Sequence, residues 1–187
     1  MASRTRRTRS TTAEINPIAP AGAWKPGDPA LGVAAAAVVS MVLRVAGPVP
    51  TRVDLRNAGT SEQQLGLTLG AVLVYLRSHY TARAIHEAWA QAAPLASALV
   101  PVLTGRRRGV LATDGPWSAT ALVRLGGAPK VRTYLLEARP GSEFPSVLRM
   151  EVGPVTWEIY DGASYTALLR GWRTAMHILA ANDPEAV

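Results

Sequence analysis

The sequence predicts an α+β fold, in which N-terminal helices with a short strand precede an antiparallel β-meander of about four strands and a C-terminal amphipathic helix. Between residues 29 and 103, apolar residues recur mainly three and four positions apart, as on helices. Between residues 118 and 160 they alternate with polar residues, as on half-buried strands. Because these strands follow one another without intervening helices, we expect an antiparallel sheet.

The first 28 residues are a basic, proline-rich arm that we expect to be disordered. They contain three prolines and little periodic hydrophobicity. Residues 29–187 are predicted to be a single α+β domain, with an alternative sub-boundary near residues 104–110. A chain of 187 residues can bury a core without disulfide bonds, which agrees with the absence of cysteine.

Segment 29–46 is predicted to be a buried helix. Asp28 is a good N-cap, and Gly47 followed by Pro48 ends the apolar run. The run is shorter than the roughly 20 residues that span a membrane, and no signal-peptidase site follows it. We therefore expect a cytoplasmic protein without a membrane partner. An exported or membrane-anchored protein is the minor alternative, because a basic arm precedes the apolar run, as in secretory signals.

Four elements are predicted in the middle of the chain. Residues 51–57 alternate as a strand does. A helix is expected over residues 60–80, where apolar residues recur three and four positions apart, and a second helix begins near Thr81. Pro94 either kinks the second helix or starts a further one that ends near Leu103.

Two hairpins are predicted in the second half of the chain. Segments 118–125 and 131–139 flank a glycine-rich loop and are expected to pair. Segments 146–152 and 155–161 join through a tight turn, and the alternation of their apolar residues agrees across it. The predicted core face of this hairpin comprises Leu148, Met150, Val152, Val155, Trp157 and Ile159. No internal repeat of fixed period is visible.

The last predicted element is an amphipathic helix capped by Asp161 or Ser164. Its apolar residues follow the helical period and are expected to pack on the sheet. The stripe comprises Tyr165, Leu168, Leu169, Trp172, Ala175, Met176 and Leu179.

No motif in the sequence carries catalytic or cofactor chemistry. His79, His86 and His177 have no metal-binding spacing, and the chain has no cysteine. No nucleotide-binding glycine loop and no nucleophile elbow occur. We therefore expect a non-enzymatic protein without a metal or cofactor.

The net charge of +7 points to an anionic partner. Arginine provides 18 of the 20 basic residues, and all the excess charge lies in the first 110 residues, since residues 111–187 carry a net charge of −1. A guanidinium group suits bidentate phosphate contacts. The alternative origin of the arginine excess is the codon bias of a GC-rich genome, which acts at every position.

These observations predict a small binding protein that contacts nucleic acid, with DNA as the expected ligand, without reading its sequence. The alternative is a protein-interaction or assembly subunit, homo- or hetero-oligomeric, because the chain is apolar and lacks catalytic motifs. The candidate nucleic-acid-binding residues lie on the arm, on the middle helices and in a basic turn with the tryptophan that follows it: Arg4, Arg6, Arg7, Arg9, Arg77, Arg83, Arg106, Arg107, Arg108 and Trp117.

Deleting residues 1–12 tests the arm. The deletion removes four arginines, so the slope of log affinity against log salt on duplex DNA should fall by up to about 3.6, and binding should weaken about equally on unrelated sequences. Fluorescence anisotropy titrations at several salt concentrations measure this slope. An intact chain that fails to bind at low salt would exclude the arm as a nucleic-acid clamp.

Overall fold

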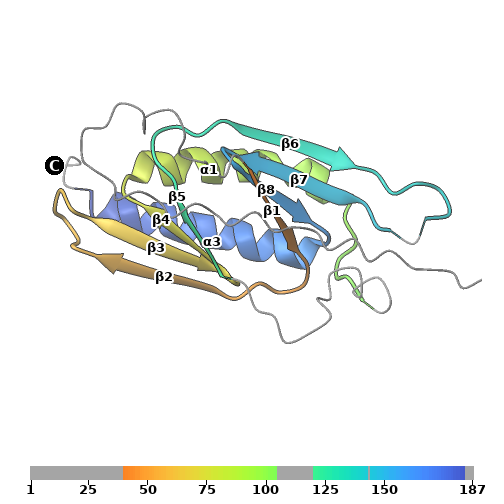
Figure 1. The fold of residues 1–187 in the computed structure, drawn as a ribbon, viewed down its shortest axis with the longest axis horizontal. Coiled ribbons are helices and arrows are strands. Elements are labelled where there is room, and N and C mark those ends of the chain that lie inside the picture. Colours follow the sequence, from red (N-terminus) through yellow and green to blue (C-terminus); the bar gives the residue numbers. More distant parts are fainter. Residues whose placement is uncertain (1–39, 105–119, 143, 184–187) are drawn as a thin grey trace, which may run out of the picture. The chain divides into compact units, whose positions relative to one another are not determined.

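The computed structural model describes residues 40–104, 120–142 and 144–183, and it shows an α+β fold with two four-stranded mixed sheets and a C-terminal helix (Figure 1). The arm and residues 105–119 lie outside the described residues. The elements, in chain order, are β1 (Met41–Val45), β2 (Thr51–Arg56), β3 (Gln64–Leu69), β4 (Val72–Leu76), α1 (His79–Gln91), α2 (Ala93–Ala96), β5 (Ala121–Arg124), β6 (Val131–Leu136), β7 (Val147–Val152), β8 (Val155–Ile159) and α3 (Gly162–Ala181).

Both sheets have the same topology. The first sheet has the order β2-β3-β4-β5, and the second has the order β6-β7-β8-β1. In each, three consecutive strands form an antiparallel meander, and the fourth strand pairs in parallel with the last strand of that meander. A parallel partner must come from elsewhere in the chain, since a tight turn joins only antiparallel strands.

The chain is an internal repeat of one unit, which the sequence analysis missed. Each unit has four strands followed by a helix, β1–β4 with α1 and β5–β8 with α3. Adding 83 to a residue number carries the β3–β4–α1 segment onto β7–β8–α3, with Gly70 on Gly153, N-cap Ser78 on N-cap Asp161 and Trp89 on Trp172. Both glycines are in the left-handed region, with φ of +62° and +56°, which a tight hairpin turn requires.

Weak sequence similarity hides this repeat. Over residues 64–92 and 147–175, only six aligned positions are identical. The pattern of burial is shared instead, because the inward residues of β3 and β4 and their equivalents in β7 and β8 are all buried. Six scattered identities fall below what inspection of a single sequence detects.

The two units exchange their first strands. β1 pairs with β8 of the second unit, and β5 pairs with β4 of the first. Buried residues of both sheets and of both long helices therefore belong to one hydrophobic core. Neither unit completes its sheet without the other.

The two long helices, α1 and α3, pack side by side (Figure 1). A cluster of aromatic residues lies at their contact. Trp89 of α1 and Trp172 of α3 are fully buried, with ring centroids 6.4 Å apart. Trp157 and Tyr165 complete the cluster, with centroids 6.1 and 6.2 Å from that of Trp89. The Tyr165 hydroxyl donates a hydrogen bond to the Trp89 carbonyl oxygen. Aromatic rings bury a large apolar area, so this cluster is a major part of the core.

Helix α3 also lies directly on the first sheet. It contacts β2 and β3, and a methyl group at Gly171 would lie 2.9 Å from Leu69 Cδ2 and 3.2 Å from Thr51 Cγ2. The absence of a side chain at this position permits the close approach of helix and sheet.

The carboxylate of Asp161 connects three parts of the chain. One oxygen accepts hydrogen bonds from the N–H groups of Gly47 and Leu103, and the other accepts from the N–H and hydroxyl of Ser164. Burial alone would raise the pKa of Asp161, but these hydrogen bonds outweigh it and hold the pKa below its ordinary value. Asp161 thus caps α3 and ties it to the loops after β1 and α2.

Several sequence predictions are confirmed. The strand at residues 51–57, the helix near Thr81, the β7–β8 hairpin and the Asp161-capped helix are all present. The hairpin has the predicted register, with Met150 opposite Trp157 and Leu148 opposite Ile159.

The predicted helix over residues 60–80 is wrong, because residues 64–76 form the β3–β4 hairpin. The apolar residues of the segment fit a strand period as well as a helical one. Leu65, Leu67 and Leu69 alternate along β3, and the turn at Gly70 reverses the chain.

Three further predictions need correction. The end of the predicted helix 29–46 is the strand β1, while residues 29–39 lie outside the described residues. The helix after Pro94 is a single turn, α2. Strands β5 and β6 occur where the first hairpin was expected, but they belong to different sheets. For β1 and β5 the pairing with distant strands decides the outcome.

Within the described residues, no helix is both long enough and apolar enough to cross a membrane.

Substituting Trp172 by alanine should destabilise the protein strongly. Removing a fully buried tryptophan side chain leaves a cavity at the contact of α1 and α3, so we expect a loss of about 3–5 kcal/mol in the free energy of unfolding. Denaturant unfolding measures this value, with Phe144→Ala, at a side chain that is 59% exposed, as the control. A loss below about 1 kcal/mol would contradict the assignment.

Asp161→Asn should weaken the fold and change its response to acid. The amide of asparagine places a donor where a carboxylate oxygen accepts two hydrogen bonds. We therefore expect the free energy of unfolding to fall by about 1–3 kcal/mol at neutral pH. A carboxyl group whose pKa is lower in the folded state than in the unfolded state stabilises the fold at pH values above its unfolded pKa. This stabilisation is lost as the pH falls through the folded pKa. The variant should therefore approach the parent in stability at acid pH. Urea unfolding at several pH values tests this, with Asp54→Asn as the exposed control.

Candidate functional site

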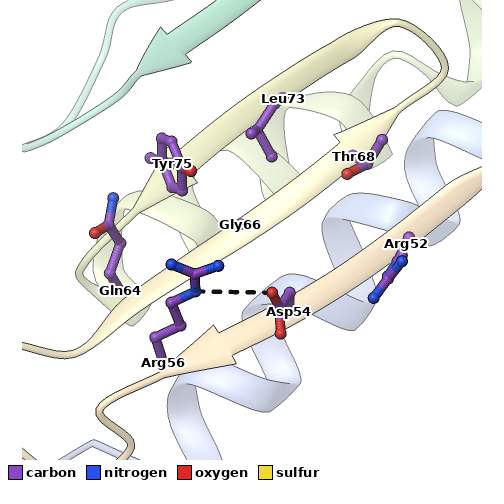
Figure 2. Close-up of a pocket in the computed structure, with 8 residues that line it drawn as sticks. All are labelled: Arg52, Asp54, Arg56, Gln64, Gly66, Thr68, Leu73 and Tyr75. Atoms are coloured by element: carbon purple, nitrogen blue, oxygen red, sulfur yellow. Dashed lines mark ion pairs between the residues drawn. The ribbon is translucent and has the colours of Figure 1, made fainter.

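The outer face of the first sheet forms a shallow polar hollow of about 260 Å³ (Figure 2). Strand alternation turns three residues of each strand toward the core and the residues between them outward. The inward residues are Leu65, Leu67 and Leu69 of β3 and Val72, Val74 and Leu76 of β4. Three strands supply the eight lining residues: Arg52, Asp54 and Arg56 from β2, Gln64, Gly66 and Thr68 from β3, and Leu73 and Tyr75 from β4.

Gly66 forms the floor of this hollow. It lies between Asp54 on β2 and Tyr75 on β4 in the sheet register. An added Cβ would lie 3.4 Å from Leu73 Cδ1 and 3.5 Å from a ring carbon of Tyr75, which is ordinary contact. Alanine would therefore fit, whereas a long side chain would fill the hollow.

A second hollow of about 600 Å³ adjoins the first and shares Gln64 and Tyr75 with it. It extends the surface toward the ends of β4 and β5, where Arg77 and Arg124 line it. The two hollows form one continuous surface with Tyr75 at its centre, which we call the open face.

Four arginines surround the open face, and they are weakly neutralised. Arg56 pairs with Asp54 at 3.9 Å, and both side chains are largely exposed. Arg77 donates a hydrogen bond to the Ser61 carbonyl oxygen at 2.8 Å. Within the part of the chain that the structure describes, Arg52, Arg77 and Arg124 form no ion pair. An exposed pair such as Arg56–Asp54 contributes little energy and leaves the guanidinium accessible.

The second sheet provides an internal comparison. Its residues equivalent to Gly66, Tyr75 and Arg124 are Arg149, Glu158 and Arg44. Arg149 Nη2 lies 2.7 Å from Glu158 Oε1, and Arg44 Nε lies 3.2 Å from Glu158 Oε2.

Glu158 pairs with both arginines at the centre of this second face. Burial would raise the pKa of Glu158, but the two arginines reverse the effect and lower it, so the carboxylate stays ionised at neutral pH. The Arg149 side chain occupies the position where the first sheet has only the hydrogen of Gly66. The same scaffold therefore presents one face whose central arginines are paired with a glutamate, and one open face.

The structure describes two of the predicted site residues, Arg77 and Arg83, and one of them lies on the open face. Arg77 lines it, at the end of a strand and not on a helix. Arg83 lies on α1, where its Nε pairs with Glu87 at 2.7 Å, and lines neither hollow. The other predicted residues, Arg4, Arg6, Arg7, Arg9, Arg106, Arg107, Arg108 and Trp117, lie outside the described residues.

Sequence reasoning missed Arg52, Arg56, Tyr75 and Arg124. Arg52 and Arg56 could have been found from the strand correctly predicted at residues 51–57, because they alternate with Val53 and therefore lie on its exposed face. Tyr75 would have emerged had residues 64–76 been interpreted as a hairpin, because it then shares a face with Gln64. Arg124 could be placed only once β5 was known to pair with β4.

Other titratable clusters offer less chemistry. His79 Nδ1 pairs with Asp183 beside the start of α1, next to a polar hollow of about 430 Å³. Across residues 40–104, 120–142 and 144–183, no three acidic, histidine or cysteine side chains are grouped so that they could hold a metal ion.

Comparison with protein-family models, curated proteins and solved structures finds no match, so function has to be inferred from the geometry of the chain.

Proposed function

We propose that this protein binds single-stranded nucleic acid, without sequence preference, through the open face. The face combines four arginines with one aromatic ring, and its floor at Gly66 carries no side chain. Proteins that bind single strands in this way use basic grooves for the phosphates and aromatic rings for stacking bases.

Each group on the face has a role in this proposal. Arg52 and Arg56 on one side and Arg77 and Arg124 on the other would contact backbone phosphates. Tyr75 at the centre would stack on a base, and Gly66 beside it leaves room for that base to approach the sheet. Bases in a duplex are already stacked on one another, so a single strand is the better ligand.

The difference between the two sheets is the observation that carries the proposal. The second sheet has arginines at comparable positions, but Glu158 pairs with two of them and Arg149 fills the floor. On the open face the floor is free of a side chain, and four arginines outnumber the two carboxylates, Asp54 and Glu62, so this surface favours an anion.

The charge distribution of the chain supports the same proposal. The outer residues of β2, β3 and β4 belong to the first 110 residues, which hold all the excess positive charge. Segment 105–119, with Arg106, Arg107 and Arg108, directly precedes β5, whose Arg124 lines the open face. The arm and this segment would add sequence-independent phosphate contacts to those of the sheet.

The protein-interaction alternative also has a specific observation in its favour. Val42 and Leu122 are exposed apolar residues on the two exchanged strands. A surface of this kind is compatible with nucleic-acid binding elsewhere on the molecule.

Matched substitutions on the two sheets test the proposal. Arg52→Glu and Tyr75→Ser should each weaken binding of a labelled 20-nucleotide oligo(dT) by about 5- to 100-fold at low salt, because each removes a phosphate or base contact. Arg132→Glu and Tyr134→Ser make the same changes on the outer face of the second sheet and should change the affinity less than about twofold. Anisotropy titrations measure all four.

Salt and duplex controls sharpen this test. Arg52→Glu should reduce the slope of log affinity against log salt by about 0.7 on single strands, while Asp54→Asn should tighten binding. A duplex of equal length should be less affected by Tyr75→Ser. Equal losses for the matched variants on the two sheets would overturn the proposal, as would an intact protein that does not bind at low salt.

A further inference from the structure

An apolar groove of about 720 Å³ lies between the two exchanged strands. Strands β1 and β5 form its sides, together with the hairpin turns at Ala71 and Pro154. These strands occupy equivalent positions in the two units, with Val42 matching Leu122. The side chains of Val42 and Leu122 are 51% and 57% exposed, so each unit contributes one exposed apolar residue.

β1 and β5 are edge strands of their sheets, and the unpaired backbone edge of each borders the groove. The odd-numbered residues of β1 and β5 bond to their sheets, since Met41 N–H donates to Pro154 O at 2.8 Å and Ala121 N–H donates to Ala71 O at 3.0 Å. Successive N–H groups of a strand point to opposite sides, so those of Val42 and Leu122 point away from the sheets. Among the strands that the structure describes, none pairs with these edges.

Charge indicates what kind of segment fits the groove. Arg124 is the one charged residue among the groove-lining residues that the structure describes, and it forms no ion pair with a described residue. No described carboxylate lines the groove. An apolar partner with an acidic residue would compensate Arg124, whereas a second copy of this face would bring another arginine.

We propose that the groove binds an extended, apolar, acid-bearing segment of a partner protein. The segment adds a strand to β1 or β5, with its backbone paired to the free N–H and C=O groups of that edge. Its apolar side chains cover Val42 and Leu122, and its carboxylate pairs with Arg124. This docking surface meets the open face at Arg124, so a peptide carboxylate and a backbone phosphate would compete for that guanidinium.

The test uses the full chain and a synthetic peptide. Since the protein has no cysteine, Thr120→Cys provides a unique attachment point at the groove for an environment-sensitive fluorophore. The probe is an eight-residue peptide of alternating valine and threonine that ends in glutamate. We expect a saturable fluorescence change on titration with this peptide.

Three comparisons identify the mode of binding. Replacing the peptide glutamate by lysine, or adding Val42→Asn to the protein, should weaken binding by roughly fivefold, the equivalent of about 1 kcal/mol. N-methylation of alternate peptide amides should abolish binding, because it removes the donors that pair with the edge. Leu136→Asn, at an exposed position on β6 at the other end of the second sheet, should leave binding unchanged.

Several results would overturn the inference. The absence of any response to the peptide excludes the surface as a strand-docking site. An N-methylated peptide that binds as well as the parent excludes strand addition, and this result holds whether or not Val42→Asn folds. A fluorescence change that depends on protein concentration without peptide assigns the groove to a second copy of the chain. Oligo(dT) titrations in parallel separate failure here from failure of the nucleic-acid proposal.

Discussion

The contact of Trp89 with Trp172 is the interaction on which the rest of the structure depends. These residues occupy the same position in the two units, and each is fully buried where α1 and α3 meet. Because the units exchange their first strands, neither sheet is complete until both units are present. Packing of the two helices therefore closes one core shared by both sheets, and the apolar area buried there compensates the entropy of ordering a largely non-local topology.

A repeated scaffold with diverged surfaces gives this chain two outer faces of different chemistry. The two outer faces rest on the same strand order and register, so their differences come from side chains alone. On one face Glu158 binds two arginines. On the other, glycine and tyrosine occupy the positions of Arg149 and Glu158, and four arginines border the hollow. Sites added to a scaffold in this way are recognised by geometry and charge rather than by sequence patterns.

The sequence analysis succeeded where local pattern and tertiary environment agree. The β7–β8 hairpin and α3 have unambiguous periods and strong turn or cap residues, namely Gly153 and Asp161. It failed for residues 60–80, where leucines spaced for either period were assigned to a helix although residues 64–76 form a hairpin. Of the candidate site residues, Arg77 was found on sequence grounds, whereas Arg124 required knowledge of which strand lies beside β4.

By itself the sequence determined the local elements of the C-terminal half, the core residues of α3 and the concentration of positive charge in the first 110 residues. These properties depend on side-chain periodicity and composition, which act over a few residues. The tertiary structure alone decided that β1 and β5 exchange partners, that the chain is an internal repeat and that one sheet face is open. Pairing between strands about 50 and 115 residues apart depends on which edges remain free and which faces must be buried, and no local pattern encodes it.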